Sequence, residues 1–292
     1  MRKILLTGAA GLLGQALVNR LIENHELLCI DIAANPFSVY ENLHYIQADL
    51  TDFAPLRLEI ANFRPDFIYN CAAYSDVDGC EVSKQLAEMI NIDLVKNLLD
   101  IPFTKLIHYS SDYVFNGQAG PYAETDPVDP LGYYGWTKLQ SEHLIQKSAK
   151  NCLIIRTNVL YGTGINTRPD FMRWVAANLQ QGRIIRVVAD QFNNPTYASS
   201  LAQASIEAAA CNLTGIWHLA GPDYYSRFEI ANIIANLLSL DHHLIRPVST
   251  IELGQPARRP QRGGLKTDKA AGVLKTKFLS LKDGLKMTFR FV

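Results

Sequence analysis

A tyrosine and a lysine four residues apart, Tyr134 and Lys138, are the residues of this chain whose types and spacing best suit chemistry. They lie in a segment that we expect to be helical, so both side chains should share one face. A phenol ionises near pH ~10 in water, and a cation held close to it favours the phenolate. The pair therefore suits proton transfer near neutral pH, although the same spacing also occurs on solvated helix faces.

A glycine-rich turn near the start of the chain is the first feature that supports a catalytic role for this pair. An apolar run, 3–6, precedes glycines at three-residue intervals, and apolar residues then recur at helical spacing. We expect a strand, a tight turn and a helix, whose free N–H groups and positive end would bind a pyrophosphate. A plain strand-to-helix connection is the alternative, because the spacing is not Gly-x-Gly-x-x-Gly. The expected cofactor contacts in this turn are Gly8, Gly11, Leu12, Leu13 and Gly14.

Residues at the ends of the next strands extend the expected cofactor site. Asp31 ends the strand 26–30, where a carboxylate can accept both ribose hydroxyls and repel a 2′-phosphate. NAD is therefore favoured over NADP, unless Asp31 merely ends a strand. Two further strands, 44–50 and 66–73, end in residues that we expect beside the adenine and under the cofactor: Asp49, Leu50, Cys71, Ala72 and Ala73.

Strands that alternate with helices predict an α/β fold, with a doubly wound parallel (Rossmann) sheet that binds ligands beyond the carboxyl ends of its strands. The fifth strand, 105–111, brings Ser111 and Asp112 to that edge. A serine hydroxyl that hydrogen-bonds a substrate carbonyl, Tyr134 to protonate it and Lys138 to tune the tyrosine form a set suited to hydride transfer. The alternative for the serine is capping of a turn.

The second half of the chain is expected to add a small C-terminal substrate-binding lobe. We assign residues 1–165 mainly to the dinucleotide-binding part and 166–292 mainly to the lobe, with some elements returning to the first part. A helix at 201–211, a strand at 215–221 and a helix that opens on a capping box, 226–229, are expected in the lobe. No linker rich in Pro, Gly or Ser separates the two parts.

The composition excludes several classes of protein. Lys plus Arg and Asp plus Glu number 28 each, so no overall field attracts nucleic acid or an anionic membrane. The cysteines form no C-x-x-C pair, and His242 and His243 lie in a polar turn, so we expect reduced thiols and no metal site. With no leader and no long apolar run, we expect a cytoplasmic protein with no membrane segment. Its partners should be small molecules or protein, and a homodimer is possible.

Four motifs together resemble the extended short-chain dehydrogenase/reductase superfamily: Thr7 to Gly14, Asn70 to Tyr74, Ser111 to Gly117, and Tyr134-x-x-x-Lys138. Within it the chain is most similar to the dTDP-4-dehydrorhamnose reductases, and the resemblance covers nearly the whole chain. The segments that carry this closer resemblance are Asp112 to Gly117, Arg156 to Gly162, Asp190 to Thr196, and Arg259-Pro260 ahead of Leu265 to Asp268.

The resemblance implies NAD(P)H-dependent reduction of a nucleotide-linked 4-keto-6-deoxy sugar, as in dTDP-rhamnose biosynthesis. Ser111 would hydrogen-bond the substrate oxygen, Tyr134 would protonate it, and Lys138 would bind the nicotinamide ribose and lower the tyrosine pKa. Arg259, in a cluster with two other arginines, could bind a diphosphate bidentately. The substrate-binding residues that the motifs imply are Asp112, Val114, Asn158, Gln191 and Arg259.

Two alternatives to the reductase stay open. The first is a nucleotide-sugar dehydratase or epimerase of the same superfamily, since a dehydratase has an acidic residue after the strand-end hydroxyl and Asp112 follows Ser111. The second is a non-catalytic NAD(P)-binding regulatory subunit, because the regulatory β subunit of methionine adenosyltransferase resembles these reductases. The reductase is favoured because the run 112–115 and the pair 190–191 go with it.

Overall fold

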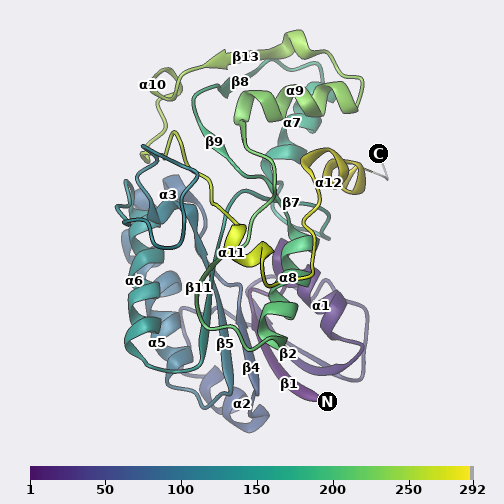
Figure 1. Ribbon diagram of the computed structural model, residues 1–292. Coiled ribbons are helices and arrows are strands. Elements are labelled where there is room, and N and C mark those ends of the chain that lie inside the picture. Colours follow the sequence, from purple (N-terminus) through teal and green to yellow (C-terminus); the bar gives the residue numbers. More distant parts are fainter. Residues whose placement is uncertain (290–292) are drawn as a thin grey trace.

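A seven-stranded parallel sheet forms the centre of the molecule (Figure 1). The computed structural model describes residues 1–289. The strands of this sheet are β1 (Arg2–Thr7), β2 (His25–Asp31), β3 (Leu43–Gln47), β4 (Phe67–Asn70), β5 (Lys105–Ser111), β6 (Cys152–Thr157) and β11 (Gly215–His218). They lie in the order β11-β6-β5-β4-β1-β2-β3, with every neighbouring pair parallel. The strand order reverses between β1 and β4, where such sheets bind ligands.

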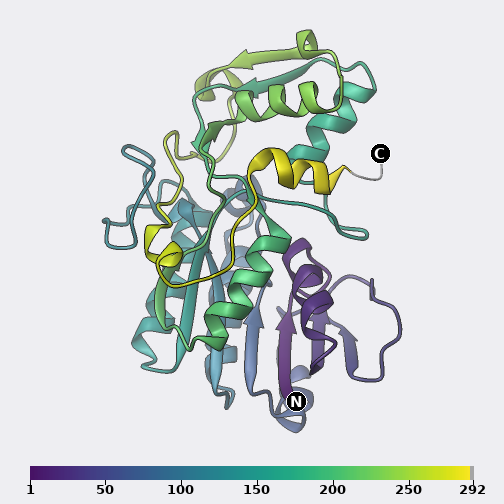
Figure 2. The same ribbon diagram turned by 45° about the vertical axis from the view of Figure 1, so that its right-hand side comes forward.

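Helices cover both faces of this sheet, as the doubly wound prediction requires (Figure 2). One face carries α1 (Leu12–Leu21) and α8 (Ala198–Ala210), and the other carries α2 (Leu56–Phe63), α5 (Leu94–Leu99) and α6 (Tyr133–Lys147). Side chains alternate along each strand, so Ile4 and Leu6 pack under α1 while Leu5 packs on the opposite side. The Rossmann prediction is therefore confirmed.

Shorter elements after β4 and β5, and one that packs against β11, complete this part of the fold. They are α3 (Val77–Val82), α4 (Lys84–Glu88), the π-helical turn η1 (Met89–Asp93), the 3₁₀ turn η2 (Asp112–Val114) and α11 (Asp268–Ala271). No helix in the range 1–289 is both long enough and apolar enough to cross a bilayer.

A smaller lobe stands beyond the carboxyl ends of the strands, at the top of Figure 1. It contains α7 (Phe171–Gln180), β8 (Ile185–Val188), α9 (Arg227–Leu237), η3 (His242–Leu244), β13 (Ile245–Val248), α10 (Thr250–Leu253) and α12 (Leu281–Thr288). β13 pairs in parallel with β8, and the apolar faces of α7, α9 and α12 form a separate core around Met172, Ile230 and Leu285.

Short strand pairs lie where the chain passes between the two parts. They are β7 (Leu160–Tyr161) with β10 (Thr196–Tyr197), and β9 (Phe192–Asn193) with β12 (Tyr225–Ser226). We expected α8 and β11 in the lobe, but both belong to the first part. β11 pairs with β6 and α8 packs on α1, because the apolar face of each continues the central core. The segment 257–265 also returns from the lobe, with Leu265 paired to Tyr122.

Candidate active site

The glycine turn between β1 and α1 lies at the switch point of the sheet and leaves no room for side chains. Gly8 has a φ of +68°, and a Cβ atom on it would lie 2.5 Å from the backbone nitrogen of Ala72. A Cβ atom on Gly14 would lie 2.2 Å from the Gly8 carbonyl oxygen. Gly11 caps α1 without a side-chain hydrogen bond, so N–H groups of the first turn stay free for an anion. This turn can hold a pyrophosphate.

Asp31, at the end of β2, faces the same turn. Its Oδ2 accepts a hydrogen bond from the Ala10 N–H at 2.9 Å, and its Oδ1 accepts one from the Ala33 N–H at 2.9 Å. These two bonds fix the carboxylate at the edge of a cavity of about 930 Å³ that begins at the glycine turn. A carboxylate held there suits the ribose hydroxyls of an adenosine.

The cavity runs from the glycine turn across the strand ends to the lobe. All the residues that we expected to bind the cofactor line it: Gly8, Gly11, Leu12, Leu13, Gly14, Asp31, Asp49, Leu50, Cys71, Ala72, Ala73, Tyr134 and Lys138. Ser111 lines it as well, from the end of β5, next to Asp112. The structure therefore brings the dinucleotide cradle and the three expected catalytic side chains into one space, whose size is ordinary for a ligand site.

Tyr134 and Lys138 project from the first two turns of α6, and one buried network holds the lysine backbone. Thr7 donates to Asn70 Oδ1 at 2.7 Å, and the Asn70 amide lies 3.1 Å from His108 Nδ1. His108 Nε2 lies 3.0 Å from Ser141 Oγ, which donates to the Lys138 carbonyl at 2.6 Å. Burial lowers the pKa of His108 well below its usual value, so the ring is neutral and can bond both neighbours. The network ties β1, β4 and β5 to the catalytic helix.

A second network holds the tyrosine backbone. Asn91, in the π-helical turn η1, donates to Thr137 Oγ1 at 3.0 Å, and Thr137 donates to the Tyr134 carbonyl at 2.8 Å. The same asparagine amide exchanges hydrogen bonds with the backbone of Tyr74. The start of α6 is therefore bonded to the segment after β4, which also lines the cavity.

The pKa values of the pair differ from the expectation that the lysine lowers the tyrosine pKa. Burial raises the pKa of Tyr134 above its usual range, nearby Tyr113 and Asp112 raise it further, and the Ser111 hydroxyl lowers it. Burial lowers the pKa of Lys138 to about 8, against the opposing field of Glu142. Desolvation exceeds the attraction of the cation for the phenolate, because Lys138 is buried and Tyr134 is partly enclosed by the cavity wall. Tyr134 therefore stays protonated at neutral pH, as a proton donor must.

We expect the affinity for NADH to fall as the pH rises through about 8, because Lys138 loses its proton there and can no longer act as a cation on the bound nucleotide. Fluorescence titration of NADH across neutral and alkaline pH measures this step. In Lys138→Arg the side chain stays charged over the whole range, so the step should vanish even if the affinity is lower. A step of unchanged size and midpoint in that variant would contradict the assignment.

Asp112 is buried beside Ser111 and faces several donors. Its Oδ1 accepts from the Ser111 hydroxyl at 3.1 Å, while its Oδ2 lies 3.3 Å from both the Asn158 amide nitrogen and the Gly264 N–H. Burial raises the pKa of Asp112, and these hydrogen bonds lower it in part. Asp112, Asn158 and Gln191 all line the cavity, as expected for substrate-binding residues.

Two expected substrate contacts lie elsewhere. Val114 is fully buried against Phe115 and does not line the cavity, because η2 turns its side chain into the core. Arg259 forms a bidentate ion pair with Asp78 of α3, with both N–O distances at 2.8 Å, and it does not line the cavity either. In this structure the Arg259 guanidinium group is thus paired with the Asp78 carboxylate and does not face the cavity.

The sequence analysis missed several residues of the cavity wall. Tyr113 packs edge-on against Tyr134, with ring centroids 5.6 Å apart, and Phe192 and Arg227 line the lobe side. Arg227 is the second residue of the capping box, 226–229, that the sequence had indicated for α9. No spacing signal connects that helix to Tyr134, since the fold alone brings them together.

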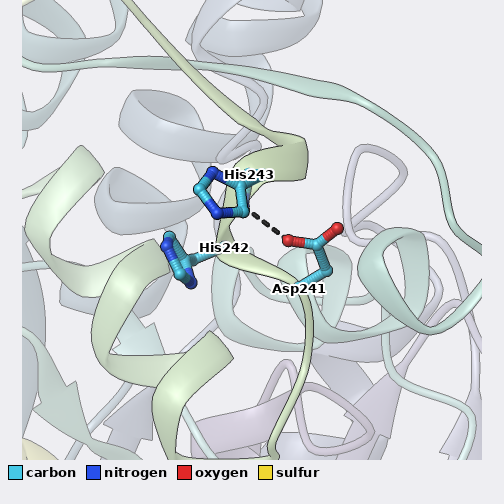
Figure 3. A group of neighbouring side chains, drawn as sticks. All are labelled: Asp241, His242 and His243. Atoms are coloured by element: carbon cyan, nitrogen blue, oxygen red, sulfur yellow. Dashed lines mark hydrogen bonds between the residues drawn. The ribbon is translucent and has the colours of Figure 1, made fainter.

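One group of neighbouring metal-type ligands occurs in the described part of the chain (Figure 3). It consists of Asp241, His242 and His243, which are consecutive, exposed and remote from the residues that line the cavity. Asp241 Oδ1 already accepts a hydrogen bond from the His243 N–H at 2.8 Å, which makes it the cap of η3. Its carboxylate thus has a structural role in this turn.

Comparison with known proteins decides the family. The family model described as the RmlD substrate binding domain matches residues 1–291. The chain belongs to the RmlD substrate binding domain family. The match spans both the Rossmann part and the lobe, and it therefore includes every residue that lines the cavity. The resemblance to extended short-chain dehydrogenase/reductases is thereby confirmed.

Individual relatives agree with this RmlD assignment. The "Probable low-salt glycan biosynthesis reductase Agl14" of Haloferax volcanii is 32% identical over 289 residues, covering 96% of this chain and 95% of that protein. The methionine adenosyltransferase 2 subunit beta of Xenopus tropicalis is 29% identical over 268 residues, covering 88% and 78%. The crystal structure of dTDP-4-dehydrorhamnose reductase from Bacillus anthracis in complex with NADP superposes with a TM-score of 0.84 at 27% identity, covering 100% and 99% of the two chains.

Proposed function

We propose that this protein reduces the keto group of a nucleotide-linked 4-keto-6-deoxy sugar with NAD(P)H. The observation that carries the proposal is that Ser111, Tyr134 and Lys138 line the same cavity as the glycine turn. The two hydrogen-bond networks that hold α6 support it, because they fix the tyrosine and lysine backbones relative to that turn. The similarity to a dTDP-4-dehydrorhamnose reductase over the full chain points to the same substrate class.

The chain's own residues supply binding and proton transfer in this reaction. A bound NAD(P)H supplies the hydride. The Ser111 hydroxyl lies beside Tyr134, and by turning its single proton away from Asp112 it can donate to the substrate oxygen as negative charge develops there. Tyr134, kept protonated by burial, gives its proton to that oxygen, and Lys138 places a positive charge one helical turn away to favour the resulting phenolate.

The carboxylates of the cavity favour the reductase over a dehydratase. Elimination of water needs one group to remove a proton and another to protonate the leaving hydroxyl. Of the carboxylates that line the cavity, Asp31 and Asp49 follow β2 and β3 on the adenosine side, and Asp170 caps α7 and pairs with Arg173. Within residues 1–289, Asp112 is the only one of these carboxylates beside Tyr134, so no second carboxylate is placed there to form an acid–base pair with it.

Oxidation of NADH and NADPH tests the proposal directly. Purified protein, dTDP-4-keto-6-deoxy sugar and each cofactor are mixed, and the loss of nicotinamide absorbance is followed. Turnover that depends on the sugar supports the reductase. Cofactor binding without turnover on this or related keto sugars would instead favour a regulatory subunit, the role in which a relative of this chain is named. Release of water without net cofactor oxidation would favour a dehydratase.

We further propose that NADH is the preferred cofactor, because the Asp31 carboxylate is held at the end of β2 by two backbone N–H groups and a carboxylate at this position would repel a 2′-phosphate. Asp31→Asn removes the charge and keeps an oxygen that can accept the Ala10 N–H. We expect the ratio of KM for NADPH to KM for NADH to fall about tenfold or more in this variant. Steady-state kinetics with both cofactors measures the ratio. A ratio that does not change, or a wild-type enzyme that prefers NADPH, would refute the preference.

A further inference from the structure

Arg227 is a guanidinium group without a protein partner on the lobe side of the cavity. It is the first residue of α9 and lines the cavity together with Phe192 and Asn193. Within residues 1–289, no carboxylate lies within 4.0 Å of it, and no side-chain hydrogen bond from its guanidinium occurs. The other arginine that lines the cavity, Arg168, is largely exposed and lies 3.9 Å from Asp76.

The surroundings of Arg227 hold its side chain in place. Its N–H donates to the Gln191 carbonyl at 3.0 Å, and the capping box formed by Ser226 and Glu229 sets the start of the helix. Its Cζ atom lies 4.7 Å from the centre of the Phe171 ring, so the guanidinium stacks against an aromatic face. Burial lowers the pKa of Arg227, which means that the charge is held at a cost in hydration. An anionic ligand would offset that cost.

We propose that Arg227 binds the diphosphate of the nucleotide-linked substrate. This inference rests on the proposed function, whose substrate necessarily carries a diphosphate between nucleoside and sugar. A planar guanidinium fork matches two phosphate oxygens in a way that a lysine does not. Arg259, the arginine that the sequence motifs favour for this role, is occupied by Asp78, whereas Arg227 faces the cavity.

Calorimetric titration of the NADH-loaded protein tests the assignment without requiring turnover. We expect Arg227→Met to raise the dissociation constant for dTDP about tenfold or more and to leave that for thymidine and for NADH unchanged. Arg227→Lys should recover part of the loss. Arg246→Met, which removes an exposed arginine of β13, is the matched control and should bind dTDP as the wild type does.

Several outcomes would overturn the assignment. The first is unchanged dTDP binding in Arg227→Met, and the second is an equal loss of affinity for thymidine. The third is that Arg227→Met loses affinity for UDP-glucuronate but not for UDP-glucose, which would place a sugar carboxylate on Arg227. Thermal unfolding controls for a structural role, because removing a half-buried charge that has no ion-pair partner should not lower the melting temperature. If the wild type binds dTDP through Arg227 but reduces no keto sugar, the diphosphate site stands and the proposed reductase falls. If it binds no nucleoside diphosphate, both fall.

Discussion

Tyr134→Phe should lower kcat for keto-sugar reduction by a factor of ~10² to ~10⁴, the usual contribution of a positioned general acid. The variant lacks only the hydroxyl that protonates the substrate oxygen. Burial keeps that hydroxyl protonated in the wild type, so the variant removes the proton donor itself. Stopped-flow and steady-state measurements of nicotinamide absorbance give kcat, and fluorescence titration gives NADH affinity, which should change little.

The neighbouring tyrosine provides the control for this experiment. Tyr133 is also on α6, but it does not line the cavity, and its hydroxyl donates to Glu88. Tyr133→Phe removes the same atom one residue away and should keep most of the wild-type kcat. The assignment of Tyr134 fails if its phenylalanine variant retains more than about a tenth of the activity, or if Tyr133→Phe loses as much.

Glu142→Gln should lower the free energy of unfolding by about 3–5 kcal/mol, because it leaves a buried guanidinium without its counter-charge. Glu142 and Arg156 form a bidentate pair at 2.9 and 2.6 Å between α6 and β6, and their side chains are 1% and 2% exposed. Glu142 also raises the pKa of Lys138, one helical turn before it. The alkaline step in NADH binding should therefore move to lower pH in the same variant. Denaturant unfolding and NADH titration measure the two effects.

A double variant distinguishes the lost charge from lost packing. Glu142→Leu combined with Arg156→Met replaces both ions by apolar chains of similar length and should recover much of the stability, since no uncompensated charge stays buried. If the unfolding midpoint of Glu142→Gln lay at the same denaturant concentration as that of the wild type, the Glu142–Arg156 pair would not stabilise the fold. Continued instability of the double variant would attribute the loss to packing around Phe115, whose ring lies 5.1 Å from Arg156 Cζ.

The part of the site that could be predicted from the sequence is the part built from local signals. The run from β1 through the glycines into α1 is contiguous, so strand, turn and helix are all visible in the residue pattern. Tyr134 and Lys138 are close in sequence on one helix, and Ser111 ends a strand that is buried throughout. In a parallel sheet the carboxyl ends of strands share one edge, so these separate signals converge without knowledge of tertiary contacts.

The rest depends on contacts between distant segments. The local sequence indicates that Arg259 is an unpaired cation in a basic cluster. Its carboxylate partner, Asp78, lies 181 residues earlier in the chain, so only the fold reveals the ion pair. Val114 belongs to a motif next to the catalytic serine, but one turn of 3₁₀ helix directs it into the core. The tyrosine pKa depends on burial by the whole cavity wall, which no spacing rule contains. Arg227 could be placed only after α9 was seen to start beside β9.

The path of the chain between the sheet and the lobe also determines how the molecule can come apart. After β7 the backbone enters the lobe, and it returns through β10, leaves again through β12, comes back along 257–265 and ends in α12 on the lobe. A protease nick in any one of these connections leaves the two halves joined by the others. Neither half can be excised as a single stretch of sequence, and the cleft between them can widen only if all the connecting segments yield together.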